Sequence, residues 1–474
     1  MKSDEIDLLD IERGLIIAPA GCGKTQLITT ALARHNGPKP ILILTHTNAG
    51  VFALRERLNR SGVKPSFYHL ATIDGWAIRL ISTFPKRAGH DPKIIESQKP
   101  NYWAIREAAF KLLKEGHIND VITASYSRLI VDEYQDCSIR QHCIVGYASN
   151  VLPTCVLGDP MQAIFGFDPK DPLAEWDKHV RGHFVYAGEL NRPWRWINAD
   201  AEHFGEWLIN VRQKILTGEA IDLQTAPDTV QWIQLDGTKD DYERLLKAGR
   251  ISPPGGVGSV LIIGKSTDLH SQRRFASQTP GAITVEAVDL RDLVSFARDL
   301  NLAAPNALER IATFAQSLMT NIDVNDLIRR VEMPINGSAR KKSTKVEMAA
   351  RAFQHDKTYQ RIADLLIEIN KETGVRLYRP AVLRACMRAL QICIGENGLT
   401  LHEAAIRVRE QNRFQGRPLP KRAVGSTLLL KGLEAEVAVV LNADQLDAKN
   451  LYVAMTRGSK LLTICSRNPI LRPT

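Results

Sequence analysis

Residues 129–136 read Leu-Ile-Val-Asp-Glu-Tyr-Gln-Asp, an apolar run that ends abruptly in acids and a glutamine. Burying a strand whose end carries this much negative charge is costly unless that end meets a metal ion. A partner stretch lies upstream, because residues 14–25 read GLIIAPAGCGKT, a buried-strand pattern followed by a glycine-rich turn. That turn has the spacing of a loop that cradles phosphate. Together the two stretches predict nucleotide hydrolysis.

The phosphate loop and the acidic strand end divide the expected chemistry between them. Lys24 would reach the β- and γ-phosphates, and the Thr25 hydroxyl would bind Mg²⁺. Asp132 would hold the same metal, and Glu133 would polarise a water molecule. A structural turn and a solvated strand end would explain either stretch alone, but not the pair. The residues expected to bind the nucleotide here are Ala20, Gly21, Cys22, Gly23, Lys24, Thr25 and Gln26.

Length, charge and cysteine content limit the class of protein. The chain has 474 residues, which suggests two to four domains. A formal net charge of +10 favours an anionic partner such as nucleic acid. Seven cysteines without a CxxC pair indicate no zinc site, no iron–sulfur cluster and no disulfide framework. The first residues lack the order of a secretion signal and no apolar run is long enough for a membrane span, so we expect a cytoplasmic protein.

Apolar runs that each end at a turn, a polar cluster or a helix indicate parallel strands with helices on both faces. The first set is 15–18, 41–45, 129–132 and 156–159, and the second is 230–235, 260–263, 282–285, 437–442 and 461–465. Helical spacing covers 101–116 and most of 291–413. The predicted fold is therefore α/β, with two lobes that each carry a helical insertion. The predicted lobes are 1–82 with 122–186, and 187–300 with 414–474; the insertions are 83–121 and 301–413.

Eight segments in a fixed order resemble the motifs of superfamily 1 helicases of the UvrD/Rep-like branch. They are APAGCGKT (18–25), THTNAGVFALRERL (45–58), TIDGWAIRLI (72–81), DEYQD (132–136), LGDPMQAIFGF (157–167), LNRPWR (190–195), STLLLKGLEAEVAVV (426–440) and LYVAMTRGSKLL (451–462). The resemblance covers both ends of the chain, and the order makes it specific. It implies two RecA-like P-loop NTPase lobes that bind ATP and Mg²⁺ between them.

The resemblance also assigns roles at the nucleotide. Gln162 would sense the γ-phosphate from the first lobe, while Arg195 and Arg457 would act as arginine fingers from the second. Trp194 stands where the family has a tyrosine that stacks on adenine. Gly432 and Glu434 fall in the KGLE segment, where the family has a glutamate near the ribose.

A second group of residues matches positions that contact nucleic acid in the family. Phe165 and Phe167 occupy aromatic positions that stack on the bases of a single strand, although core packing is an equal alternative for Phe165. Further matches to strand-contacting motifs are Thr45, Asn48, Thr72 and Trp76. Lys341 and Lys342 offer only a possible duplex contact, since a lysine run is more often a solvated face.

The chain departs from the family pattern at several positions. Its first glutamine is Gln26, beyond the loop, whereas family members have a glutamine upstream that reads the adenine edge. Asp74 and Leu428 replace histidines, and His46 replaces an aromatic residue. Because these three changes fall on the expected nucleic-acid track, hydrolysis is better supported than processive unwinding. Because the sequence stops soon after the motif at 451–462, we expect no appended nuclease or partner-docking tail.

Three functions follow from this pattern. The preferred expectation is an ATP-dependent helicase or translocase that moves 3′ to 5′ on single-stranded or tailed DNA, the direction coming wholly from the resemblance. A second is a DNA- or nucleotide-sensing ATPase subunit that regulates a partner nuclease, because the TxDGW variant looks like the form found in compact UvrD-like subunits of antiphage systems such as Gabija. A third is an RNA translocase, since phosphate and stacking contacts tolerate a 2′-hydroxyl.

Overall fold

The computed structural model describes residues 6–96, 100–166, 168–265, 268–333, 343–396, 398–412 and 420–473. The chain forms two compact units. Unit 1 comprises Met1–Asp236 with Glu436–Thr474, and unit 2 comprises Gly237–Ala435. The positions of these units relative to each other are not determined, so each is described by itself.

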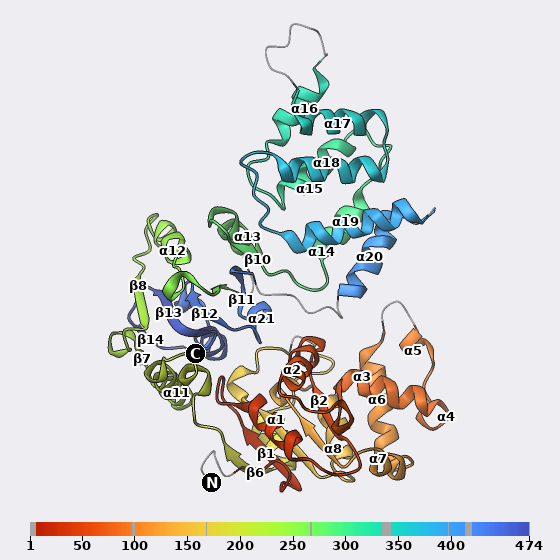
Figure 1. Ribbon diagram of the computed structural model, residues 1–474, viewed down its shortest axis with the longest axis vertical. Helices are drawn as coiled ribbons and strands as arrows, with labels where there is room; N and C mark the ends of the chain where they lie inside the picture. Colours follow the sequence, from red (N-terminus) through yellow and green to blue (C-terminus); the bar gives the residue numbers. More distant parts are fainter. Residues whose placement is uncertain are drawn as a thin grey trace. The chain divides into compact units, whose positions relative to one another are not determined.

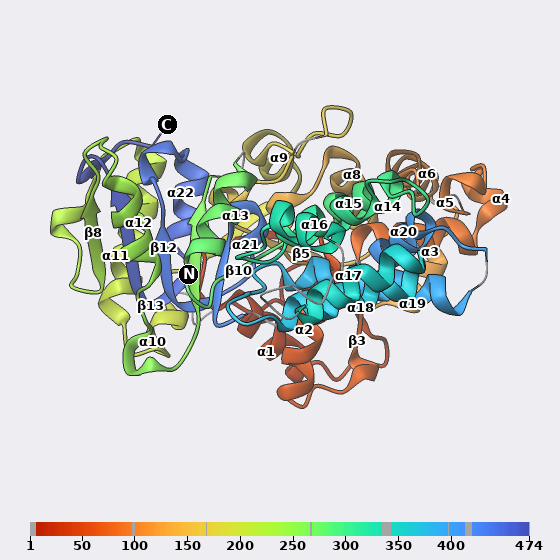
Figure 2. The same ribbon diagram turned by 90° about the horizontal axis from the view of Figure 1, so that it is seen from above.

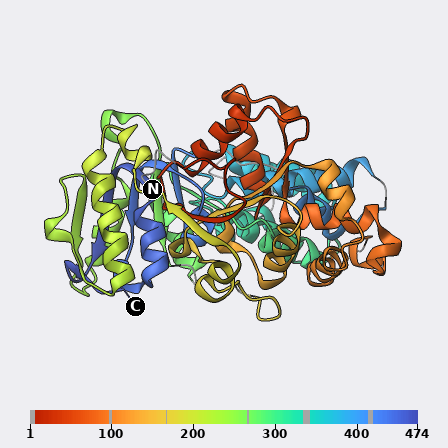
Figure 3. The same ribbon diagram turned by 90° about the horizontal axis from the view of Figure 1, so that it is seen from below.

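The first sheet lies wholly in unit 1 and contains the two stretches that predict hydrolysis (Figures 1 and 3). Its strands are β1 (Arg13–Ile17), β2 (Ile41–Thr45), β3 (Tyr68–Thr72), β4 (Arg128–Val131), β5 (Thr154–Gly158) and β6 (Val185–Glu189). They are parallel and lie in the order β3-β2-β4-β5-β1-β6. This order places the ends of β1, β4 and β5 side by side at one edge, where ligands of open α/β sheets bind.

Alternation along the strands divides the core of this sheet into two layers. Leu15, Leu42 and Val131 face one layer, which packs on α3 (Ile73–Thr83), α6 (Tyr102–Lys114) and α8 (Ile139–Ala148). Ile16 and Ile43 face the other layer, which packs on α1 (Lys24–Arg34) and α2 (Asn48–Arg60). Burial on both faces explains why these strands read as continuous apolar runs.

A group of helices separates α3 from β4. It consists of α4 (Pro85–Ala88), α5 (Lys93–Glu96), α6 and α7 (Asn119–Ser125). The Asn101 side chain accepts a hydrogen bond from the Ala104 N–H and so caps α6. Helix α6 packs on both α3 and α8, which attaches the inserted segment to the first sheet.

The rest of unit 1 consists of the segment around and after β6 and of the C-terminal segment from residue 436. Its elements are α9 (Arg181–His183), α10 (Trp194–Ile197), α11 (Glu202–Thr217), β7 (Ile221–Asp222), β8 (Val230–Gln234), α22 (Ala448–Met455), β13 (Gly458–Ser466) and β14 (Ile470–Leu471). Strands β13 and β8 pair in parallel, with Leu462 opposite Val230. Helix α11 packs on α10 and α22.

The second sheet also has six strands, in the order β10-β11-β9-β12-β13-β8. Besides β8 and β13 it contains β9 (Val260–Gly264), β10 (Ile283–Thr284), β11 (Arg422–Ser426) and β12 (Ala435–Val440). In unit 2, β11 pairs in parallel with β9 and with β10. Its other elements include α12 (Asp241–Gly249), α13 (Leu269–Gln278) and α21 (Thr427–Leu430). With two parallel sheets and helical insertions in both, the predicted α/β fold with two RecA-like lobes is confirmed.

Between β10 and β11 the chain forms a helical array (Figure 2). Its helices are α14 (Arg291–Asp299), α15 (Ala307–Gln316), α16 (Val324–Glu332), α17 (Lys345–His355), α18 (Tyr359–Lys371), α19 (Pro380–Gly395) and α20 (Leu401–Asn412). They share one core, which includes Leu293, Phe353 and Leu390. Lys341 and Lys342, named as a possible duplex contact, lie outside the described residues.

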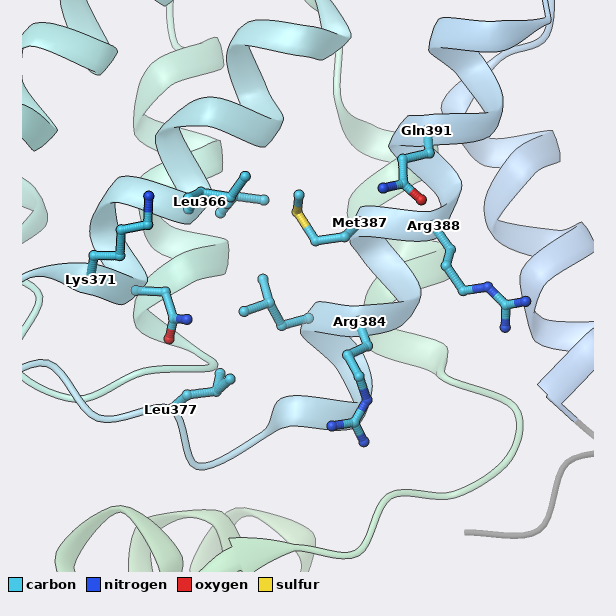
Figure 4. A pocket seen from close by; sticks show the side chains of 10 residues that line it. Leu366, Lys371, Leu377, Arg384, Met387, Arg388 and Gln391 are labelled. Atoms are coloured by element: carbon cyan, nitrogen blue, oxygen red, sulfur yellow. The ribbon is translucent and has the colours of Figure 1, made fainter. Parts of the chain in front are cut away.

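An open pocket of about 450 Å³ lies in this array (Figure 4). The Leu366 and Met387 side chains point toward one another there, whereas the guanidinium groups of Arg384 and Arg388 point away from them. Because its polar groups do not converge, the pocket lacks the usual character of a ligand site. None of the predicted site residues lines it. Among the described residues, no helix is long and apolar enough to cross a membrane.

Candidate nucleotide site

The phosphate loop joins β1 to α1 and depends on two glycines. Gly21 has φ 72° and Gly23 has φ 90°, a left-handed conformation that side chains with a Cβ rarely adopt. Space is a second constraint, because a Cβ on Gly21 would lie 2.4 Å from the Trp196 ring and one on Gly23 would lie 2.8 Å from the Trp194 ring. Gly23 caps α1 without a side chain, which leaves the helix N-terminus open to an anion.

Lys24 is the first residue of α1 and contacts both acids at the end of β4. Its ammonium lies 3.1 Å from Asp132 Oδ1 and also donates to the Glu133 carboxylate. Burial lowers the pKa of Lys24, but the charges of Asp132 and Glu133 outweigh burial and raise it overall. Lys24 is therefore a permanent cation at the site. Burial raises the pKa of Asp132, an effect that the Lys24 charge opposes.

Glu133 sits at a strained point of the backbone. Its φ of 55° and ψ of 41° are left-handed, which costs a non-glycine residue about 1–2 kcal/mol. The turn directs its carboxylate to Lys24 on one side and to Gln135 on the other, whose Nε2 donates at 2.5 Å. Two opposite partners thus fix the group that we expect to orient water.

A chain of hydrogen bonds leads from Glu133 to Gln162. The Gln135 Oε1 accepts from the Asp159 N–H at 3.1 Å, and Asp159 follows directly after β5. The Asp159 Oδ2 then accepts from the Gln162 Nε2 at 3.1 Å. The Glu133 carboxylate, which follows β4, is therefore connected to the Gln162 amide, which follows β5. The connection runs through side chains and a single backbone N–H.

One charged residue of this site is absent from the sequence-based prediction. Arg212 of α11 is 3% exposed and donates from Nε and Nη2 to Asp159 Oδ1 at 3.3 and 3.1 Å. Its Nη1 donates to Glu189 Oε1 at 2.7 Å. Burial lowers the pKa of Arg212, but Asp159, Tyr452 and Glu189 raise it overall. A single arginine on an amphipathic helix gives no sequence signal for this position.

The loop cysteine is not a nucleophile in this setting. Burial, and then the Asp159 charge, raise the pKa of the Cys22 thiol to about 12, although nearby Arg212 and Arg195 lower it. Cys22 is therefore a neutral, buried thiol at physiological pH.

Helices α10 and α22 bring further predicted residues near the loop. Arg195 Nη1 donates to the Thr456 carbonyl at 2.5 Å, and its Cβ would lie 3.0 Å from a Cβ on Gly21. Arg457 is 2% exposed and donates from Nε to the Val453 carbonyl at 2.8 Å. Each arginine thus donates to a backbone carbonyl of unit 1.

Two aromatic residues complete this side of the site. The Tyr452 hydroxyl accepts a hydrogen bond from the Ala20 N–H at 3.3 Å, which ties α22 to the phosphate loop. The Trp194 ring is covered by the Arg192 guanidinium, 3.9 Å from the ring centroid. Gly432 has φ 81° and belongs with Glu434 to unit 2, so neither is placed relative to the loop.

The residues expected to contact nucleic acid differ in exposure. Phe165 is half-buried, with its ring 5.8 Å from that of His46, and Asn48 is exposed at the first turn of α2. Thr72 caps α3 by accepting from the Gly75 N–H. Thr45 and Trp76 are each 1% exposed. Phe167 lies outside the described residues.

Asp74, expected on the nucleic-acid track, takes part in a network of charges inside unit 1. It accepts two hydrogen bonds of 2.7 Å from Arg106 of α6, and Gln141 donates to it at 3.0 Å. Arg106 also donates to Asp171 at 2.9 Å, and Asp171 accepts from Ser138 at the start of α8. In this conformation Asp74 connects helix α6, which carries Arg106, to the segment 72–81, which carries Thr72.

Three histidines pack behind the acidic turn. The His142 ring lies 6.2 Å from His179 and 5.9 Å from His183, and its Nδ1 is 2.8 Å from the Tyr134 hydroxyl. Burial, and then the charges of the neighbouring imidazoles, lower the pKa of His142 to about 4. Burial also lowers the pKa of His183, whose Nε2 lies 2.9 Å from the Ser149 hydroxyl.

This cluster predicts acid-sensitive folding. Because the pKa of His142 is lower in the folded chain, the unfolded chain binds the proton first as pH falls. Stability is therefore fully present above about pH 6.5 and is lost toward pH 4, by up to roughly 3 kcal/mol for this group. Urea unfolding at a series of pH values should show the loss, and His142→Phe should have a shallower pH slope. An unchanged slope would show that His142 titrates normally.

The phosphate loop, the acidic strand end and the two parallel sheets define a P-loop NTPase. A family model described as an AAA domain matches residues 7–168. The chain is 22% identical over 236 residues to an ATP-dependent helicase/nuclease subunit of Oenococcus oeni (strain ATCC BAA-331 / PSU-1). The match covers 49% of this chain, and the chain spans about a fifth (19%) of that relative's length. These two likenesses agree with the resemblance of the ordered motifs to superfamily 1 helicases.

Two solved helicase structures are also similar to the chain. The crystal structure of Pif1 helicase from Candida albicans is 12% identical, with 98% of this chain and 92% of that chain covered at a TM-score of 0.38. The complex of Arterivirus nonstructural protein 10, a helicase, with DNA is 11% identical, with 53% and 47% covered at a TM-score of 0.27.

Proposed function

We propose that the chain is a cytoplasmic ATPase that single-stranded DNA stimulates and that moves 3′ to 5′ along the strand, separating duplexes at tails. The observation that carries the proposal is the contact of Lys24 with both Asp132 and Glu133 beside the glycine loop. Phosphoryl transfer requires a cation, a metal-binding acid and a base within one site, and this contact supports those roles for Lys24, Asp132 and Glu133. The polarity rests on the resemblance to UvrD/Rep-like helicases.

The residues present fit Mg²⁺ and a nucleoside triphosphate. The Thr25 hydroxyl and the Asp132 carboxylate are hard oxygen donors of the kind that Mg²⁺ prefers. When bound, the ion would neutralise charge on the β- and γ-phosphates. Lys24 would exchange its carboxylate partners for phosphate oxygens, and the released Glu133 would accept a proton from the attacking water. The water oxygen would bond to the γ-phosphorus while the bond from that phosphorus to the bridging oxygen breaks, which releases ADP and inorganic phosphate.

Charge stabilisation would come from Gln162, Arg195 and Arg457, and Trp194 would stack on the base. Arg192 now covers one face of Trp194, so stacking on that face requires the guanidinium to move. Gly432 and Glu434 would complete the nucleotide site from the second lobe. We keep the sequence boundaries of the two lobes and their insertions as part of this proposal.

The strand-binding surface would include Asn48, Thr72, Phe165 and Phe167. The first three lie at the ends of β2, β3 and β5 or in the segments that follow these β-strands. The single-stranded DNA would therefore run across the same edge of the sheet as the nucleotide. Trp76 and Thr45 would support this surface from beneath, because both are buried. Hydrogen bonds from Glu133 to Gln162 would carry the state of one site to the other.

A test of this function combines hydrolysis with strand separation. Steady-state ATP hydrolysis should rise by about tenfold or more when single-stranded DNA is added, equivalent to about 1.4 kcal/mol of the barrier. Duplexes with 3′ tails, 5′ tails and blunt ends should then be compared with ATP and with GTP. Equal hydrolysis with and without DNA would contradict the proposal, and unwinding only from 5′ tails would reverse the polarity. Matched RNA competitors test the RNA alternative.

A second candidate is a regulatory protein that senses DNA or nucleotide and controls a partner nuclease in antiphage defence. The name of the Oenococcus relative, a helicase/nuclease subunit, favours it, although the match covers only 19% of that protein. A nuclease that co-purifies with the chain in stoichiometric amounts, together with failure to unwind any tailed duplex, would select this candidate over the free helicase.

A further inference from the structure

The buried ion-pair group around Asp159 is not explained by the motifs. Asp159 is 1% exposed and its carboxylate serves two structural tasks at once. Oδ1 accepts from the Met161 N–H at 3.2 Å and so caps the turn η4 (Pro160–Gln162), while Oδ2 accepts from the Gln162 amide. A buried carboxylate is stable only when charge and hydrogen bonds compensate for lost water.

Arg212 supplies that compensating charge from a helix about 50 residues further along the chain. Its Nε and Nη2 both reach Asp159 Oδ1, while Nη1 reaches Glu189 Oε1 at the end of β6. The planar guanidinium of Arg212 thus binds the Asp159 and Glu189 carboxylates in one fixed geometry, which the single ammonium of a lysine cannot reproduce. The Glu189 side chain is 30% exposed, whereas that of Asp159 is fully enclosed.

We propose that Arg212 is a positioning residue for γ-phosphate sensing. It fixes Asp159, and through Asp159 it holds the Gln162 amide at the edge of the nucleotide site. Because Gln135 joins the Asp159 N–H to Glu133, Arg212 also fixes the far end of the hydrogen-bond chain that reaches the base. The inference rests on the proposed ATPase function, of which it names a further residue.

A displaced amide affects turnover more than ground-state binding. Small misplacement of a group that acts in the transition state can cost roughly 100-fold in rate. Arg212→Gln should therefore lower kcat by roughly 100-fold and leave KM within about threefold. Arg212→Lys keeps the buried charge and is the variant expected to fold normally, with kcat lowered by roughly tenfold. Gln213→Ala, on the exposed face of α11, is the matched control and should behave as wild type.

A double-mutant cycle separates positioning from general loss of structure. If Arg212 acts through Gln162, Arg212→Lys should add little to the effect of Gln162→Ala on kcat, because the group it orients is already absent. Effects that multiply, an effect on KM alone, or wild-type kcat in Arg212→Lys would each overturn the proposal. Thermal unfolding of every variant identifies any that are merely unfolded.

A second readout does not need turnover. Gln162 would distinguish triphosphate from diphosphate, so Arg212→Lys should reduce the ratio of ATPγS to ADP affinity by the same small factor as Gln162→Ala does, up to about threefold. Isothermal titration of the full chain with each nucleotide measures that ratio. If the wild-type chain fails to hydrolyse ATP, the proposed function falls while this ratio still tests Arg212; an unchanged ratio in Arg212→Lys would overturn the inference by itself.

Discussion

Lys24→Ala is expected to lower ATP turnover by on the order of 100- to 1,000-fold, because it removes the cation that stabilises charge on the transferring phosphoryl group. The structure adds a second consequence. Lys24 holds the Asp132 and Glu133 carboxylates beside each other, and its removal leaves two like charges in a buried site. Repulsion between them favours proton uptake by one carboxylate, so the residual activity should rise with pH more steeply than in wild type.

Steady-state hydrolysis and nucleotide titration over a series of pH values measure both effects. Lys114→Ala on the exposed face of α6 is the control for loss of a lysine, and it should retain full activity. Turnover by Lys24→Ala within a few-fold of wild type would show that the glycine loop does not serve phosphoryl transfer. Unfolding of the variant is checked separately by thermal denaturation.

In the first sheet, the sequence predicts the interior strands and misses the two edge strands. Strands β1, β2, β4 and β5 are buried on both faces, so each reads as an apolar run. Strands β3 and β6 were not predicted, because they form the two edges of the first sheet and are largely half-buried or exposed. Strand β11 was also missed, since RAVGS contains only small and polar residues beyond its valine.

Within the site, sequence predicts residues that belong to contiguous motifs. Gly21, Lys24, Asp132 and Glu133 have recognisable spacing because phosphate and metal binding require neighbouring groups on a loop or a strand end. Arg212 has no such signal, because its role depends on α11 reaching Asp159 through the tertiary fold.

Trp76 illustrates a different limit of motif-based assignment. It lies on α3 in a stripe with Ile73, Ala77 and Leu80, all of which face the core. The motif identifies the position as one near the strand track, but helical periodicity decides which way the side chain points. Contact with a nucleic acid through Trp76 would require the core of this layer to open.

Glu133→Gln is expected to produce the cleanest separation of binding from chemistry. Removing the group that accepts the proton from water should lower kcat by roughly 100- to 10,000-fold. Binding should persist, because the glutamine oxygen can still accept from Gln135 and the Lys24 ammonium keeps Asp132 as a partner. Affinity for ATPγS should therefore stay within about threefold of wild type, less than 1 kcal/mol in binding free energy.

The left-handed backbone at Glu133 makes glutamine a better test than alanine or glycine. Glycine would relax the φ of 55° and change the turn, whereas glutamine keeps the side-chain length and the same backbone cost. Glu115→Gln, at an exposed helix end, is the control for loss of a carboxylate. If Glu133→Gln hydrolyses ATP at the wild-type rate, the base must be reassigned, and Asp136, three residues further along the same acidic turn, is the next carboxylate to replace.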